Sequence, residues 1–212
     1  QMGATEIGQG ADTVFTQMAA EVTGITEDKV NVLSTQDTDV SPFDTGAYAS
    51  RQTYVSGMAV KKTGAIFKEK ILDYAAYMLE KPQDTLDVRD NHIVDKETGT
   101  QLLPMEELAT TAFYSLDRSV HITAEATSHC KTNTFATGAC FAEVEVDMPL
   151  GKVKVTNIVN VHDSGKLINP KLAAAQVHGG MSMGLGYGLS EELLFDAKGR
   201  PLNDNLLDYK LP

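Results

Sequence analysis

Apolar side chains recur along the chain at two different spacings, and each spacing predicts its own kind of secondary structure. Spacing of three and four residues, which places apolar side chains on one side of a helix, predicts helices over residues 11–24, 53–80, 105–113 and 170–192. Ser50 or Thr53 is expected to cap the long second helix, since hydroxyl side chains accept hydrogen bonds from the free N–H groups at a helix start. Lys81-Pro82 is expected to end it, because proline cannot continue a helix.

Alternation of apolar with polar residues predicts strands, and it is clearest in a hairpin over residues 140–161. Val144 and Val146 alternate there with acidic neighbours, and Pro149-Leu150-Gly151 supplies a turn. Shorter stretches of the same kind predict strands over residues 29–34, 86–89, 92–95 and 119–126. Asp90-Asn91 is the expected turn of a second, shorter hairpin.

Helices interleaved with antiparallel hairpins are typical of an α+β fold. A polar loop over residues 35–50 is expected to lead into the long helix, and a turn at Ala197-Lys198-Gly199 to follow the last helix. We therefore expect helices packed on mixed or antiparallel sheets in two lobes, residues 1–130 and residues 131–212.

The composition agrees with a folded domain and narrows the choice of partners. Of the 212 residues, 42% are hydrophobic and 22% are charged, which is ordinary for a globular protein. The net charge of −11 argues against nucleic acid, because phosphate binding needs clustered Lys and Arg. The sequence contains no apolar run of about 18 residues, so no membrane span is predicted. Only Cys130 and Cys140 occur, without a CxxC pair, so a reducing cytoplasm is the expected location.

The predicted last helix contains glycines at motif-like spacings. Gly180-Met181-Ser182-Met183-Gly184 matches the GxSxG nucleophile elbow, but that motif needs a preceding strand and a later histidine, and none follows His178. Gly184-Leu185-Gly186-Tyr187-Gly188 lacks the GxGxxG spacing of a dinucleotide loop. Each glycine costs a helix about 1 kcal/mol relative to alanine, so this many glycines need a reason. The favoured interpretation is that another group approaches the helix backbone closely.

The histidines do not form a metal-binding pattern, because neither an HxH nor an HExxH pair occurs. They are His92, His121, His129, His162 and His178. The segment Val161-His162-Asp163-Ser164-Gly165 groups one of them with polar residues, and a hydrogen-bonded turn at the end of a strand is the favoured interpretation. A metal ion bound directly by histidine and cysteine side chains is therefore not expected.

Two loops that lead into helices are better candidates for chemistry. Gly8-Gln9-Gly10 precedes the first helix, where free N–H groups attract phosphate and glycine permits close approach. The Gln9 amide can both donate to and accept from a heterocycle. The loop at residues 46–53 offers hydroxyls, an amide and the Arg51 guanidinium before the second helix. Either loop alone is also compatible with an ordinary helix start.

Together the two loops lie in segments, residues 3–13 and 46–53, that closely resemble the pterin-binding segments of xanthine dehydrogenase/aldehyde oxidase molybdenum subunits. Further segments resemble the same family in the same order, at residues 141–147, 161–165, 168–170, 175–180 and 205–212. The resemblance covers essentially the whole chain, and it is nearest to the bacterial purine-catabolic xanthine dehydrogenase subunit.

The resemblance implies that several residues contact the pterin or its phosphates. These residues are Gly8, Gln9, Gly10, Ser50, Arg51, Gln52, Thr53 and Gln176. Ala49 would face the molybdenum oxo group through its backbone. The implied cofactor is molybdenum-molybdopterin, in bacteria often as the cytosine dinucleotide form.

The resemblance also implies a reaction and its partners. A small heterocyclic substrate, hypoxanthine or xanthine, would be hydroxylated with water as the oxygen source. Electrons would pass through 2Fe–2S clusters and FAD on partner subunits to NAD. Further partners would be the N-terminal part of the same subunit and the FAD-binding and iron–sulfur subunits, with neither nucleic acid nor membrane involved.

The match falls short of a complete enzyme. The family's glutamate base is expected beyond Pro212 and its substrate pocket upstream of Gln1, and the cysteine set for an iron–sulfur cluster is missing. No catalytic residue is therefore assigned, and the second lobe is expected to be truncated at its C-terminus and the chain alone to be inactive. The alternatives are part of a nicotinate- or aldehyde-oxidising relative, or a structural or interaction domain of the same fold.

Overall fold

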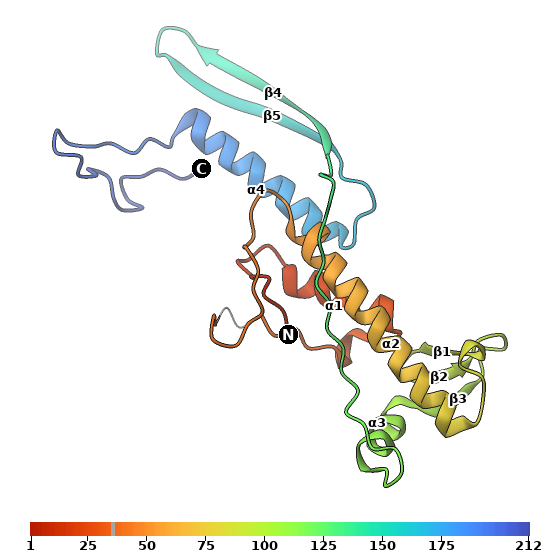
Figure 1. Ribbon diagram of the computed structural model, residues 1–212. Coiled ribbons are helices and arrows are strands. Elements are labelled where there is room, and N and C mark those ends of the chain that lie inside the picture. Colours follow the sequence, from red (N-terminus) through yellow and green to blue (C-terminus); the bar gives the residue numbers. More distant parts are fainter. Residues whose placement is uncertain (35–36) are drawn as a thin grey trace. The chain divides into compact units, whose positions relative to one another are not determined.

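The computed structural model describes residues 1–34 and 37–212. The chain divides into two compact units, Gln1–Asn133 and Thr134–Pro212. The first unit contains helices α1 (Ala11–Thr23), α2 (Gly57–Leu79) and α3 (Met105–Tyr114) with a three-stranded sheet. The second unit contains a two-stranded sheet and helix α4 (Pro170–Leu189), as Figure 1 shows. The α+β class predicted from the sequence is confirmed.

The sheet of the first unit is antiparallel, with the strand order β1 (Leu86–Arg89), β2 (His92–Asp95) and β3 (Gln101–Pro104). Asp90 and Asn91 join β1 to β2 with φ values of 46° and 62°, the left-handed backbone that a tight hairpin turn requires. The hairpin prediction is confirmed. Strand β3 was not predicted, because its four residues show no alternation in the sequence.

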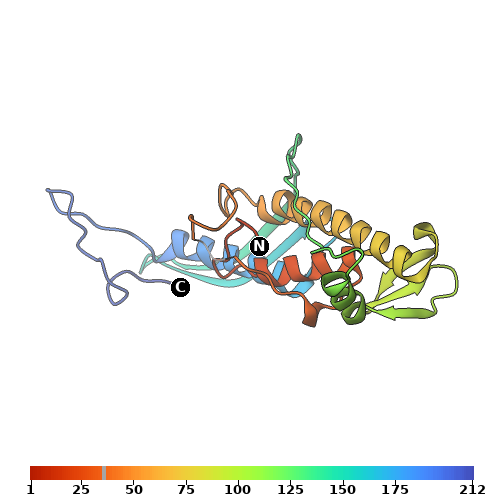
Figure 2. The same ribbon diagram turned by 60° about the horizontal axis from the view of Figure 1, so that its bottom comes forward.

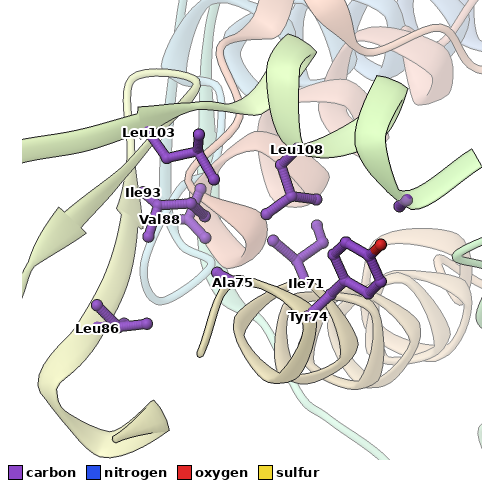
Figure 3. Packing of buried hydrophobic residues seen from close by; sticks show 9 residues of the cluster. Ile71, Tyr74, Ala75, Leu86, Val88, Ile93, Leu103 and Leu108 are labelled. Atoms are coloured by element: carbon purple, nitrogen blue, oxygen red, sulfur yellow. The ribbon is translucent and has the colours of Figure 1, made fainter. Parts of the chain in front are cut away.

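The main core of the first unit lies between α2, the sheet and α3 (Figure 3). Helix α2 contributes Ile71, Tyr74 and Ala75, whose spacing places them on one side of the helix. They pack against the buried residues of the sheet and of α3, namely Leu86, Val88, Ile93, Leu103, Leu108 and Ala112. Burying each of the larger side chains contributes about 2 kcal/mol, so this layer holds the sheet on the long helix.

A second, smaller cluster joins α1 to α2, which lie side by side in Figures 1 and 2. Ala4, Ala11 and Phe15 are buried there. A Cβ atom on Gly64 of α2 would lie 2.9 Å from a methyl carbon of Val22, so glycine permits the two helices to approach closely. This packing fixes the start of α1 beside the start of α2, where the two candidate loops lie.

Two predicted strands are wrong. Residues 27–29 form a short 3-10 helix and residues 30–34 are irregular, although the N–H of Met2 donates to the carbonyl of Leu33 at 3.2 Å. Residues 119–126 are also irregular, with Ile122 packed against the main core. Alternation predicts an extended segment with one buried side, but a strand also needs a neighbour for its backbone hydrogen bonds.

The long helix starts differently from the prediction. A π-helical turn, Gln52–Ser56, leads into α2, and no side chain caps either segment, so the predicted capping by Ser50 or Thr53 is wrong. Ser50 instead adopts a left-handed backbone. The predicted end is confirmed, since α2 stops at Leu79 before Lys81-Pro82. The predicted polar loop at 35–50 begins at residues 35 and 36, which lie outside the described residues, and the rest of it contains no helix or strand.

The second unit contains the long predicted hairpin. Strands β4 (Thr137–Asp147) and β5 (Lys152–Asp163) pair antiparallel around a turn at residues 148–151, and extend beyond the predicted range at both ends. Every residue of β4 is exposed. Helix α4 ends at Leu189 rather than near residue 192, because the N–H groups of Ser190 and Glu191 both donate to the carbonyl of Gly186.

Candidate functional site

The first candidate loop is closed by the carboxylate of Glu6. Its Oε1 accepts the N–H of Gly8 at 2.7 Å and of Gly10 at 3.1 Å, and its Oε2 accepts the N–H of Asp12 at 3.0 Å. Partial burial works to raise the pKa of Glu6, but the backbone N–H groups of Asp12, Gly10 and Gly8 outweigh it and hold the pKa below its usual value. The N–H groups of Gly8, Gly10 and Asp12 are therefore engaged by Glu6, so the expectation of free N–H groups at this helix start is wrong.

The two candidate loops meet through their glutamine side chains. The Gln9 amide donates to the side-chain oxygen of Gln52, a residue 43 positions further along the chain. Both amides also donate to the carbonyl of Thr5, from Gln9 at 2.9 Å and from Gln52 at 2.8 Å. The side-chain oxygen of Gln9 accepts the N–H of Ile7 at 2.7 Å. The structure thus brings together the two loops that the sequence analysis selected, and Gln52 is buried between them.

The second loop is organised around Asp44. This carboxylate accepts hydrogen bonds from the N–H of Gly46 at 3.2 Å, from the hydroxyl of Ser56 at 3.0 Å and from the guanidinium of Arg51. Partial burial works to raise the pKa of Asp44, but the Gly46 N–H and the Arg51 and Ser56 side chains outweigh it and lower the pKa. The Arg51 guanidinium also donates to the Gly46 carbonyl at 2.8 Å and lies 5.8 Å from the centre of the Tyr48 ring.

Ala49 and Ser50 stand out in this loop because both have a left-handed backbone, with φ values of 51° and 55°. Such a conformation costs a non-glycine residue about 1 kcal/mol or more, and it is retained where the surroundings enforce it. Ala49, Ser50 and Thr53 are exposed. Ala49 and Ser50 are thus accessible to a ligand.

Gln176 lies on α4 in the second unit and is exposed. The sequence predicted another group close to the backbone at the glycines of α4, and the structure agrees only in part. A Cβ atom on Gly186 would lie 1.7 Å from the Glu191 carboxylate, whereas Gly179, Gly180, Gly184 and Gly188 have no atom that close within the described residues.

Glu6 and Asp44 are the site residues that the sequence analysis missed. Weak signals for both are present in the sequence. Glu6 lies just before a helix start, where a carboxylate is favourable, and Asp44-Thr45-Gly46 has the pattern of a turn in which aspartate accepts a backbone N–H two residues on.

The donor set suits an organic heterocycle better than a metal bound directly by side chains. The Gln9 and Gln52 carboxamides meet between the loops, and a carboxamide can both donate to and accept from a heterocycle. Among residues 1–34 and 37–212, no group of three or more His, Cys, Asp or Glu side chains could hold a metal ion. Cys130 and Cys140 are free thiols. In the same described ranges, no helix has the length and apolar character needed to cross a membrane.

The chain is thus an α+β protein in which two loops, joined through glutamine side chains, lie at the start of two packed helices. A family model described as a molybdopterin cofactor-binding domain matches residues 1–212. The chain therefore belongs to the molybdopterin cofactor-binding domain family.

Individual relatives agree with this family. The chain is 50% identical to the xanthine dehydrogenase molybdenum-binding subunit of Escherichia coli O157:H7, over 100% of this chain and 28% of that subunit. It is 27% identical to the nicotine 6-hydroxylase large subunit of Paenarthrobacter nicotinovorans, over 99% of this chain and 26% of that one. The crystal structure of quinoline 2-oxidoreductase from Pseudomonas putida 86 superposes with a TM-score of 0.84 and 27% identity, over 99% of this chain and 27% of that one. The chain thus spans about a quarter of the length of these relatives.

Proposed function

We propose that this chain forms part of the molybdopterin-binding subunit of a xanthine dehydrogenase-type hydroxylase. The observation that carries the proposal is the contact between Gln9 and Gln52, which joins the two candidate loops into one site. The 50% identity to a xanthine dehydrogenase molybdenum-binding subunit supports a purine, hypoxanthine or xanthine, as the substrate and water as the oxygen source.

Within this proposal, the site residues hold the cofactor rather than react. Gln9, Gln52, Ser50, Arg51 and Thr53 bind the pterin and its phosphates. Gly8 and Gly10, whose N–H groups donate to Glu6, contribute by permitting close approach. The family resemblance assigns a pterin contact to Gln176 as well. Ala49, which is exposed, would hold the metal end of the cofactor through its backbone. The bound group, as molybdopterin or its cytosine dinucleotide, supplies the redox metal, while the protein supplies position and hydrogen bonds.

The proposal extends to partners and location. Iron–sulfur clusters and FAD on partner subunits would carry electrons from the site to NAD, and the N-terminal part of the same subunit would supply the substrate pocket. The free thiols of Cys130 and Cys140 are compatible with a reducing cytoplasm.

Cofactor content tests the binding role. In the complete molybdenum subunit, Gln9→Ala and Gln52→Ala should each lower molybdenum and pterin per subunit by about 10-fold or more, since each removes a hydrogen-bonding partner that joins the loops. Gln101→Ala on the exposed end of β3 is the matched control and should retain both. Unchanged content in both loop variants would contradict this site.

A substrate panel on the complete complex tests the purine assignment. We expect turnover of hypoxanthine or xanthine, and none by the 212-residue chain alone. A preference for nicotinate or an aldehyde would instead favour the relative that oxidises those compounds. A native protein from which neither molybdenum nor pterin can be extracted would favour a structural or interaction domain.

A further inference from the structure

We propose that Asp44 is a positioning residue of the cofactor site, which holds the second loop in its binding shape before the cofactor arrives. The inference rests on the proposed function, because the ligand of this loop is taken to be molybdopterin. Asp44 does not itself need to touch the cofactor.

The geometry of the loop supports this role. The Asp44 carboxylate contacts Gly46 at the start of the loop, Arg51 in the middle and Ser56 at the end of the π-helical turn. A single side chain therefore ties together three points between residues 46 and 56 of the sequence. Ser56 is buried, and the side chains of Asp44 and Arg51 are only 14% and 18% exposed, so water screens the ion pair less than at an open surface.

What these bonds maintain is the left-handed backbone of Ala49 and Ser50. Both residues are exposed, so side-chain packing does not enforce their conformation. The bonds from Arg51 back to Asp44 and to the Gly46 carbonyl close the chain around this pair. Without Asp44, the strained pair would lose its main restraint and the loop would sample other shapes, which lowers affinity for a ligand that needs only one of them.

A competing explanation is that Asp44 contributes only general stability. Asp87 provides the matched control, because it is also a partly buried carboxylate with a lowered pKa and a basic partner, Lys68 at 2.7 Å. Burial works to raise the pKa of Asp87, and the bonds from Lys68 and the Val88 N–H outweigh it. Asp87 lies on β1, and none of its hydrogen bonds reaches either candidate loop.

The test uses the complete molybdenum subunit in its complex, with Asp44→Asn, Asp87→Asn, Arg51→Met and the double variant Asp44→Asn/Arg51→Met. Asn keeps the size of Asp44 but removes the charge that holds Arg51. We expect Asp44→Asn to lower retained molybdenum and pterin by about 10-fold, as loss of an outer hydrogen-bonding partner commonly does. Asp87→Asn should retain wild-type content. The loss in the double variant should be smaller than the product of the two single losses, because both changes remove the shared Asp44–Arg51 interaction.

A second measurement does not depend on the cofactor. In protein prepared without molybdopterin, trypsin cleavage after Arg51, followed by mass spectrometry, should be about 10-fold faster in Asp44→Asn than in wild type or Asp87→Asn, because the cleavage rate follows the population of open loop. If Asp44→Asn does not fold, Ser56→Ala removes a single bond of the same carboxylate and should shift both measurements in the same direction by a smaller factor.

Wild-type cofactor content together with unchanged cleavage in Asp44→Asn would overturn the inference. So would an equal loss in Asp87→Asn, which would reduce Asp44 to a contributor to general stability. If wild-type protein carries neither molybdenum nor pterin, the proposed function fails instead, and the cleavage measurement still decides whether Asp44 shapes the loop.

Discussion

At the scale of single residues, a few positions are determined by contacts that only one residue type permits. Gly24 ends α1 with a φ of 79°, and a Cβ atom there would lie 2.0 Å from the carbonyl oxygen of Val88. Asn91, in the turn between β1 and β2, also contacts this segment, since its side chain accepts the N–H of Thr26 at 2.9 Å. The end of α1 is therefore joined directly to the β1–β2 turn.

Gly24→Ala should lower the free energy of unfolding by about 3 kcal/mol or more, because it adds both a left-handed strain and a clash with backbone. Gly99→Ala is the matched control, since Gly99 has a φ of 73° but its nearest atom to a Cβ is the end of the Arg89 side chain at 3.8 Å. It should lose only about 1 kcal/mol. Urea unfolding of the two variants measures the difference, and equal losses would mean that the Val88 contact is relieved by a backbone shift.

At the scale of elements, the start of α1 depends on an acidic residue outside the helix. Gly10 precedes α1 without a capping side chain of its own, and Glu6 takes the N–H groups that a cap would otherwise accept. Since these bonds keep the folded-state pKa of Glu6 below that of the unfolded chain, ionised Glu6 stabilises the fold above the unfolded-state pKa. The contribution is lost as the pH falls through the lower, folded-state pKa.

Glu6→Gln should lower stability by about 1 kcal/mol at neutral pH, in the range of a lost helix cap. The difference from wild type should shrink as the pH falls through the lowered pKa of Glu6, where the wild-type carboxylate also becomes protonated. Glu21→Gln on the exposed side of α1 should change little at any pH. Thermal unfolding as a function of pH compares the three proteins, and a Glu6→Gln effect that persists undiminished in acid would argue against the charge.

At the scale of the whole molecule, the two units differ in how much core each contains. Every described residue of the two buried hydrophobic clusters belongs to the first unit. In the second unit, β4 is exposed along its length and Gly186 is the only buried residue of α4. A two-stranded sheet with no buried side is at best marginally stable in water.

We therefore expect residues 1–133, produced alone, to unfold in one cooperative transition, whereas residues 134–212 alone should show none. Calorimetry of the two pieces, with circular dichroism to follow secondary structure, tests this expectation. A sharp transition in residues 134–212 would show that the hairpin and α4 form a core of their own.

The sequence by itself determined the local elements and the resemblance to a molybdopterin-binding family. Helical periods, the Asp90-Asn91 turn and the alternation in β4 and β5 act between near neighbours, so they can be read without a fold. Only the tertiary structure decided which extended segments became strands. Residues 29–34 and 119–126 found no ladder partner among the described residues, while β3, with no pattern of its own, paired with β2.

The candidate site shows the same division. Its loops were recognisable from residue types, but the contact of Gln9 with Gln52 joins residues 43 positions apart and exists only because α1 packs on α2. The choice of Glu6 and Asp44 as the carboxylates that close the loops was likewise made in three dimensions. Hydrogen bonds between distant residues depend on how the helices pack, and packing is a property of the whole first unit rather than of any short stretch of sequence.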